Sequence, residues 1–138
     1  MRKDDLEALY KILSDDKVMK HLEAKYTKQK TIAFLDQNGL SEPPRIYAAE
    51  DDGEFIGYVI FHEYDRSSME IGWVLDYDYW GKGYASKLTE MLLEKCKFLN
   101  KEAVIECAWK QEVSKHIAMK YDFVLREQKD GLYIFRKQ

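Results

Sequence analysis

Hydrophobic residues recur at three-to-four spacing through the first third of the chain, which predicts short amphipathic helices there. The first set comprises Leu6, Leu9, Tyr10 and Leu13, and the second, after a polar break at 14–16, comprises Val18, Met19 and Leu22. A third helix is predicted to begin near Thr27 and to end at Asn38–Gly39, because Pro43 and Pro44 bar its continuation.

The middle of the chain changes to short aromatic and β-branched runs, which are typical of strands. These runs cover 45–50, 54–61 and 69–75, and polar turns separate them at 51–53 and 64–68. The Asp-Asp-Gly turn at 51–53 is a strong hairpin signal. We therefore expect three strands in an antiparallel meander.

The helical period returns after 80–83 and then gives way to strands again. One stripe of the predicted helix carries Ala85, Leu88, Leu92, Cys96 and Leu99. Beyond it we expect a strand over 103–109, a short helix over 113–121, and a closing hairpin of 123–125 with 132–135 around Asp130–Gly131. A strand thus leads into a glycine turn that opens a helix.

Length and composition predict one globular domain over 1–138, with 46% hydrophobic and 34% charged residues. No apolar run approaches the ~20 residues that a membrane helix needs. The acidic, early helical start is unlike a signal peptide, so we expect a cytoplasmic protein. The net charge of −3 argues against nucleic acid and anionic membrane as partners, and it suits a cationic acceptor.

The cysteines and histidines show no pattern typical of a metal or redox site. Cys96 and Cys107 lack C-x-x-C spacing. Cys96 falls on the apolar stripe of its predicted helix and Cys107 inside a predicted strand, so we expect small core residues rather than nucleophiles. His21, His62 and His116 have no ligand spacing and are assigned structural roles. No bound metal is expected.

The turn Gly81-Lys82-Gly83 is a candidate anion site. Glycines allow positive φ and close approach of a ligand, and the first turn of a helix presents unpaired N–H groups and the positive end of its dipole. Lys82 could add a charge-assisted bond. An ordinary tight turn is the alternative. A dinucleotide fold is excluded, because Ser86 replaces the third glycine and antiparallel strands precede the turn.

Two longer motifs resemble the GNAT acetyltransferases, in particular the branch with the RimJ and RimL enzymes that acetylate ribosomal-protein N-termini. The first is Glu70-Ile71-Gly72-Trp73-Val74-Leu75, and the second is Tyr79-Trp80-Gly81-Lys82-Gly83-Tyr84-Ala85-Ser86. The resemblance covers nearly the whole chain in helix and strand order. It implies an α+β fold with three layers: a mixed, mostly antiparallel sheet with helices on both faces and a V-shaped splay between the central strands.

The resemblance also implies a cosubstrate, acetyl coenzyme A, and the residues that hold it. The pantetheine arm would pair with the strand backbone of Trp73, Val74 and Leu75. The pyrophosphate would lie on amides of the turn and first helical residues, namely Gly81, Lys82, Gly83, Tyr84, Ala85 and Ser86. Gln111 stands where the family usually has asparagine, and Ser114 matches the serine of the same motif.

Acetyl transfer to a primary amine requires that the amine lose a proton, because alkyl amines have pKa values near 10.4 and α-amines near 8. The resemblance places the base at Glu70, for which a solvated strand residue is the alternative. Backbone amides near Val74 and Leu75 could polarise the thioester. Ser114 or Tyr121 could protonate the departing thiolate, although Tyr121 is favoured as a packing residue.

Three departures from the family pattern leave room for a second function class, a module that binds coenzyme A or a nucleotide without turnover. Asp78 would repel phosphate if it faced the cosubstrate. Gln111 is longer than asparagine, and Asp122 replaces a glycine where positive φ is expected.

The acceptor stays open between a protein N-terminal α-amine and a small amine, with a slight preference for the α-amine. We expect its specificity to lie in the first third and in loops around Tyr64 and Gln128. The chain starts in a helix where the family usually has a strand, and an exposed sheet edge would permit a homodimer.

Overall fold

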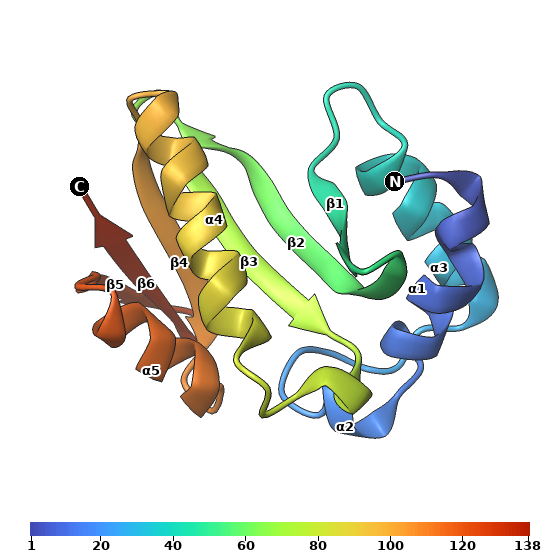
Figure 1. Cartoon of the computed structure of the whole chain (residues 1–138). Helices are drawn as coiled ribbons and strands as arrows, with labels where there is room; N and C mark the ends of the chain where they lie inside the picture. The colour runs from blue at the N-terminus through green and yellow to red at the C-terminus, as the bar shows by residue number, and fades with distance from the viewer. The chain divides into compact units, whose positions relative to one another are not determined.

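The computed structural model describes all 138 residues (Figure 1). The chain forms two compact units that interleave along the sequence. Unit 1 consists of Met1–Ile60 and Trp73–Tyr84, and unit 2 consists of Phe61–Gly72 and Ala85–Gln138. None of the helices combines the length and the apolar character that crossing a membrane requires.

Six strands form one mixed sheet in the order β1-β2-β3-β4-β6-β5. The strands are β1 (Ile46–Asp51), β2 (Glu54–Asp65), β3 (Ser68–Leu75), β4 (Glu102–Ala108), β5 (Val124–Lys129) and β6 (Leu132–Lys137). Pairing is parallel between β3 and β4, whereas β1 with β2, β4 with β6, and β5 with β6 are antiparallel. The predicted mixed, mostly antiparallel sheet with helices is confirmed.

The parallel ladder between β3 and β4 is short. It pairs Ser68, Met69 and Glu70 with Glu102, Ala103 and Val104, which are the first three residues of each strand. By contrast, β4 stays paired with β6 as far as Ala108. The pairing of β3 with β4 is thus confined to the start of both strands.

The helices of unit 1 begin at the residues that the sequence indicated. They are α1 (Leu6–Leu13), α2 (Asp16–Met19) and α3 (Lys28–Phe34), with the short helical turns η1 (Lys3–Asp5), η2 (Leu35–Gly39) and η3 (Tyr77–Tyr79). Asp15 accepts hydrogen bonds from two backbone N–H groups of α2, and Thr27 accepts one from Lys30. Leu9, Ile12 and Leu13 of α1 are fully buried and pack with Tyr58 and Val74 in the core of the unit.

The C-terminal end of β3 is held closely against β2 within unit 1. A Cβ atom at Gly57 would collide with the carbonyl oxygen of Val74 and would lie 2.9 Å from Cα of Leu75. The N–H of Asp76 donates to the carbonyl of Ile56 at 2.9 Å. Since only glycine permits this approach, Gly57 fixes the position of the strand end that leads into the glycine turn.

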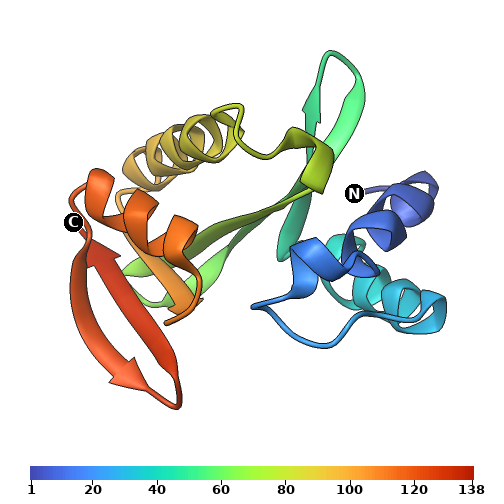
Figure 2. The same cartoon turned by 90° about the horizontal axis from the view of Figure 1, so that it is seen from below.

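Unit 2 contains most of α4 (Tyr84–Phe98), all of α5 (Glu112–Lys120) and the β5–β6 hairpin (Figure 2). Val104 at the centre of β4 is fully buried, and Cys96, Ala103 and Cys107 are each 2% exposed. The predicted helix over 113–121 and the strand over 103–109 are confirmed to within one residue at each end.

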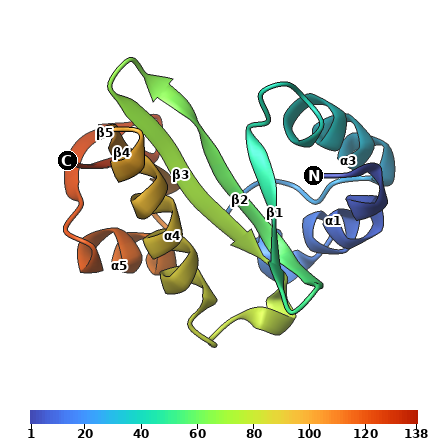
Figure 3. The same ribbon diagram turned by 45° about the horizontal axis from the view of Figure 1, so that its top comes forward.

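The expectation of loops around Tyr64 and Gln128 is wrong, because both residues lie inside strands. β2 continues to Asp65, whose carboxylate accepts hydrogen bonds from the backbone N–H of Ser67 and the hydroxyl of Ser68, so the β2–β3 turn is tight (Figure 3). β5 continues to Lys129 beyond an irregular register near Leu125. Since every residue of β5 is exposed, the strand carries no apolar alternation from which its length could be predicted.

Candidate active site

The glycine turn has the backbone geometry that the sequence predicted. Gly81 and Gly83 have φ values of 71° and 85°, and α4 begins at the next residue, Tyr84. A Cβ atom built on either glycine would have no other protein atom within 4 Å, so open space adjoins the turn. The first turn of a 15-residue helix presents N–H groups without intrahelical partners. The turn therefore fits a pyrophosphate group.

Side chains around the turn anchor it rather than fill it. The indole N–H of Trp80 donates to the carbonyl of Leu75 at 3.0 Å, which ties the turn to the end of β3. The Tyr84 hydroxyl donates to Asp51, and this bond raises the pKa of Tyr84. Lys82 Nζ lies 5.6 Å from the ring centroid of Tyr79. The turn is thus held at both ends by residues of unit 1.

Asp78, which the sequence identified as a source of repulsion, is paired with a lysine. Lys11 Nζ lies 3.1 Å from Asp78 Oδ2 and 3.0 Å from Asp76 Oδ2, and hydrogen bonds to these two carboxylates raise the pKa of Lys11. Sequence reasoning missed Lys11 because it lies 67 positions before Asp78. The lysine offsets negative charge next to the proposed phosphate site.

The first turn of α4 in unit 2 contacts the end of α5. Lys120 Nζ lies 3.2 Å from the Ser86 hydroxyl, which adds a cation at the helix N-terminus that the sequence did not single out. The Tyr121 hydroxyl donates to Glu90 Oε2 at 2.8 Å, and this bond is the largest cause of the raised pKa of Tyr121. Because the Tyr121 hydroxyl already donates its hydrogen to Glu90, Tyr121 is the weaker of the two acid candidates.

Gln111 and Ser114 occupy the turn and first residues of α5. The side-chain oxygen of Gln111 accepts a hydrogen bond from the backbone N–H of Ala108 at 2.5 Å. This oxygen is therefore engaged within the turn between β4 and α5. Ser114 lies in the first turn of α5 and is half-buried. Their contacts with a cosubstrate stay predictions.

Asp122 has a φ of 66°, which confirms the expected left-handed conformation at the place where the family has glycine. Its N–H donates to the carbonyl of Met119, and the N–H of Phe123 donates to that of Ala118. Aspartate tolerates this region better than most residues do, so the substitution leaves the end of α5 intact.

Glu70 is not a solvated strand residue, because its side chain is 19% exposed and faces a histidine. His62 Nε2 lies 3.5 Å from Glu70 Oε1, and the His62 side chain is 14% exposed. His62 Nδ1 lies 3.0 Å from the carbonyl oxygen of Glu63. His62 was assigned a structural role from the sequence, yet β2 places it beside the residue proposed as the base.

Further ionisable groups share this region of unit 2. Glu70 is in register with Val104 of β4, and Glu106 follows two residues later, on the same face. Burial, followed by Glu106, Glu127 and Glu70, raises the pKa of Tyr64. Three carboxylates therefore act on this tyrosine, against one cation, Arg136, whose guanidinium carbon lies 6.0 Å from the ring centroid. The balance of charge favours a cationic rather than an anionic ligand.

The two cysteines are core residues, as predicted. Cys96 and Cys107 are each 2% exposed, and burial raises the pKa of both thiols to about 11. Because only the thiolate is an effective nucleophile, these thiols are unsuited to covalent acyl transfer at neutral pH.

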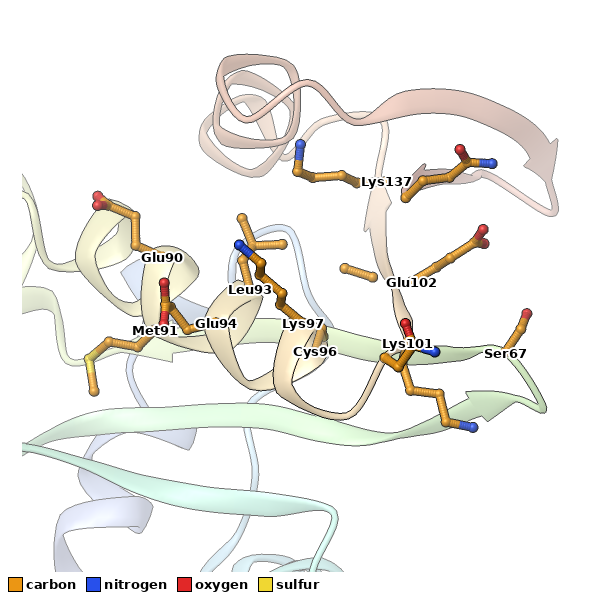
Figure 4. A pocket seen from close by; sticks show the side chains of 13 residues that line it. Ser67, Glu90, Met91, Leu93, Glu94, Cys96, Lys97, Lys101, Glu102 and Lys137 are labelled. Carbon is orange, nitrogen blue, oxygen red and sulfur yellow. The ribbon is translucent and has the colours of Figure 1, made fainter.

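A separate hollow of about 970 Å³ lies along the C-terminal half of α4 in unit 2 (Figure 4). Its walls include Glu94 and Lys97 of α4, Ala103 of β4 and Lys137 of β6. Glu90, the lining residue nearest the start of α4, lies six residues along the helix from Tyr84, which is about 9 Å at the usual rise per residue. The hollow is therefore apart from the N-terminal turn of that helix.

Comparison with known proteins identifies the class to which this strand, turn and helix belong. Residues 1–124 match the family model described as an acetyltransferase (GNAT) domain. The chain is 30% identical over 127 residues to a Bacillus subtilis (strain 168) protein named "Uncharacterized N-acetyltransferase YnaD", covering 89% of this chain and 75% of that protein. The chain belongs to the GNAT acetyltransferase family, which confirms the prediction of an acetyltransferase.

Solved structures share the fold. A GNAT-family acetyltransferase from Bacillus anthracis superposes with a TM-score of 0.84 at 22% identity, covering 99% of this chain and 90% of that one. RimL, a ribosomal α-N-protein acetyltransferase solved in complex with coenzyme A, superposes with a TM-score of 0.81 at 18% identity, covering 99% and 90%. At these identities the likeness extends to the fold alone.

Proposed function

We propose that this acetyltransferase uses acetyl coenzyme A and passes the acetyl group directly to a primary amine. The observation that carries the proposal is the open turn at Gly81 and Gly83 with the N-terminus of α4 directly after it. The pyrophosphate would be held by backbone N–H groups from Gly81 to Ser86. Lys82 lies within the turn, and Lys120 contacts the Ser86 hydroxyl. The cosubstrate supplies an activated acetyl thioester.

The strand before the turn would hold the rest of the cosubstrate. We place the pantetheine arm along the backbone of Trp73, Val74 and Leu75, where Gly57 fixes the strand end. Amide N–H groups of Val74 and Leu75 are the candidates for stabilising negative charge on the thioester oxygen. Gln111 and Ser114 complete the proposed set, with Ser114 as the acid.

Glu70 would remove the proton from the incoming amine. A primary amine is mostly protonated at neutral pH and must lose a proton before it can attack a carbonyl carbon. The surrounding carboxylates suit a cationic acceptor. An α-amine is favoured because its pKa near 8 lowers the cost of deprotonation.

The test is release of free thiol from acetyl coenzyme A with a panel of amines that includes N-terminal peptides and small polyamines. We expect turnover by the wild type and a fall in kcat of about 100-fold in Glu70→Gln, the range expected for loss of a general base. The matched control is Glu63→Gln, which makes the same change at an exposed residue of β2. Calorimetric binding of acetyl coenzyme A without turnover on any amine would favour the non-catalytic binding module.

A further inference from the structure

We propose that His62 is a positioning residue for Glu70, and that the two side chains accept the proton of the acceptor amine as a pair. The inference rests on the proposed function and names a further residue for the same reaction. Its basis is the contact across β2 and β3, in which His62 Nε2 lies 3.5 Å from Glu70 Oε1. Both side chains are largely withdrawn from solvent.

The backbone fixes which ring nitrogen of His62 carries hydrogen. Nδ1 lies 3.0 Å from the carbonyl oxygen of Glu63, and a carbonyl oxygen can only accept a hydrogen bond. Nδ1 must therefore be the donor. In the neutral ring, Nε2 then presents a lone pair, and this lone pair faces a carboxylate oxygen of Glu70.

Two acceptors that face each other are stabilised by one proton between them. Nδ1–H donates to the Glu63 carbonyl. When neither side chain holds a further proton, the lone pair on Nε2 therefore faces the negatively charged carboxylate of Glu70. A proton on either atom converts this opposition into a hydrogen bond. The distance of 3.5 Å is long for such a bond, as catalytic contacts often are before substrate binds.

The proposed step conserves protons and charge. The N–H bond of the substrate ammonium breaks, its electron pair stays on nitrogen, and the proton passes to Glu70. His62 Nε2 then stabilises that proton as a hydrogen-bond partner, so the pair goes from a net charge of −1 to zero. The neutral amine is free to attack the thioester carbonyl carbon.

Other charged groups lie near Tyr64, which is two residues along β2 from His62. Glu106 and Glu127 add negative charge near Tyr64 on β2, where the guanidinium carbon of Arg136 lies 6.0 Å from the centroid of the Tyr64 ring. Negative charge favours a cationic substrate. These carboxylates therefore assist binding of the substrate.

The kinetic test compares His62→Gln, His62→Asn and wild type with the fastest amine of the panel, from pH 6.5 to one unit above the pKa of that amine. Glutamine and asparagine can donate to Glu70 or to the Glu63 carbonyl but cannot hold an extra proton. We expect kcat to fall about 10- to 50-fold at pH 7, with KM for the amine unchanged within about twofold. The deficit should shrink to about threefold at the highest pH, where the amine is neutral by itself.

The control is His21→Gln, the same substitution at an exposed histidine of unit 1. Loss of kcat in Glu70→Gln with full activity in both His62 variants would overturn the pairing and leave the proposed function intact. A deficit that is equal at all pH values would also overturn it, because that result indicates a purely structural role. No turnover by the wild type would overturn the proposed function itself.

A readout independent of activity keeps the inference testable if the variants fold poorly. Nitrogen-15 NMR of the wild-type imidazole in its neutral form reports which ring nitrogen carries hydrogen. We expect hydrogen on Nδ1 and an unprotonated Nε2 for His62. Hydrogen on Nε2 instead would place a donor against Glu70 permanently and would overturn the shared-proton pair.

Discussion

Three turns of this chain contain glycines with positive φ, but only one of them leads into a helix. Asp52–Gly53 and Asp130–Gly131 have nearly identical torsions, with φ of 52° at both aspartates and 81° and 80° at the glycines. They join β1 to β2 and β5 to β6. Gly81 and Gly83, at 71° and 85°, precede α4.

The difference shows that the element after a glycine turn decides what the turn can bind. The residues on either side of a hairpin turn belong to two paired strands, in which N–H and C=O groups bond to each other. A helix N-terminus leaves its first N–H groups pointing outward in one direction. Open space adjoins Gly53 and Gly131 as well, so space alone does not make an anion site.

The largest effect is expected from filling the glycine turn before α4. The double substitution Gly81→Ala with Gly83→Ala adds Cβ atoms at two left-handed positions, which disfavours the present backbone and places methyl groups in the open space. We expect KM for acetyl coenzyme A to rise about 30-fold, which corresponds to about 2 kcal/mol of binding free energy, with kcat changed by less than about threefold. Steady-state kinetics at saturating amine measure both constants.

The matched control for the glycine turn is Gly53→Ala with Gly131→Ala. It introduces the same strain in the two hairpins, so it should lower the free energy of unfolding by a similar amount. KM for acetyl coenzyme A should stay within about twofold of wild type. Equal rises in KM for the two double variants would mean that a general loss of stability accounts for the effect, and not the turn before α4.

A smaller effect is expected from removing the cation that pairs with Asp76 and Asp78. Lys11→Met leaves two carboxylates without their lysine close to the proposed phosphate site. We expect KM for acetyl coenzyme A to rise about fivefold, and less at high salt, because screening weakens repulsion between exposed charges. The measurement is KM at low and high ionic strength.

Two further variants isolate the cause of the Lys11 effect. Adding Asp78→Asn to Lys11→Met should bring KM back most of the way, because it removes one of the repelling charges. Lys28→Met breaks the exposed ion pair with Glu7 elsewhere in unit 1 and should leave KM unchanged. An unaltered KM in Lys11→Met would show that Asp78 does not act on the cosubstrate.

The smallest effect is expected at Lys82, although it stands between the two glycines. If backbone N–H groups hold the pyrophosphate, Lys82→Gln should raise KM for acetyl coenzyme A only about two- to threefold. Lys87→Gln, at an exposed lysine of α4, is the control and should have no effect. A rise above about tenfold for Lys82→Gln would assign the binding to the side chain instead of to the backbone.

The sequence predicted features that depend on neighbours in the chain. The helix starts after the polar break at 14–16 and near Thr27, and the turns at 51–53, 81–83 and 130–131, appear where local residue chemistry placed them. Their physical causes, namely side-chain capping and the torsional freedom of glycine, act within a few residues. The succession of elements followed from these local signals.

Features that depend on register or on distant pairing could not be predicted. His62 meets Glu70 only because β2 and β3 are adjacent strands, and a shift of one residue would turn His62 to the opposite face. Lys11 and Asp78 likewise meet through folding across 67 positions. The exposed strand β5 has no apolar pattern from which its end at Lys129 could have been predicted.

The most direct test of the central claim is an amide NMR titration of the protein with coenzyme A. The account predicts that the backbone N–H resonances from Gly81 to Ser86 shift in a saturable way, while those of Gly53 and Gly131 stay in place. Resonances of 81–86 that do not move when coenzyme A binds, or shifts of equal size at all three turns, would contradict the account.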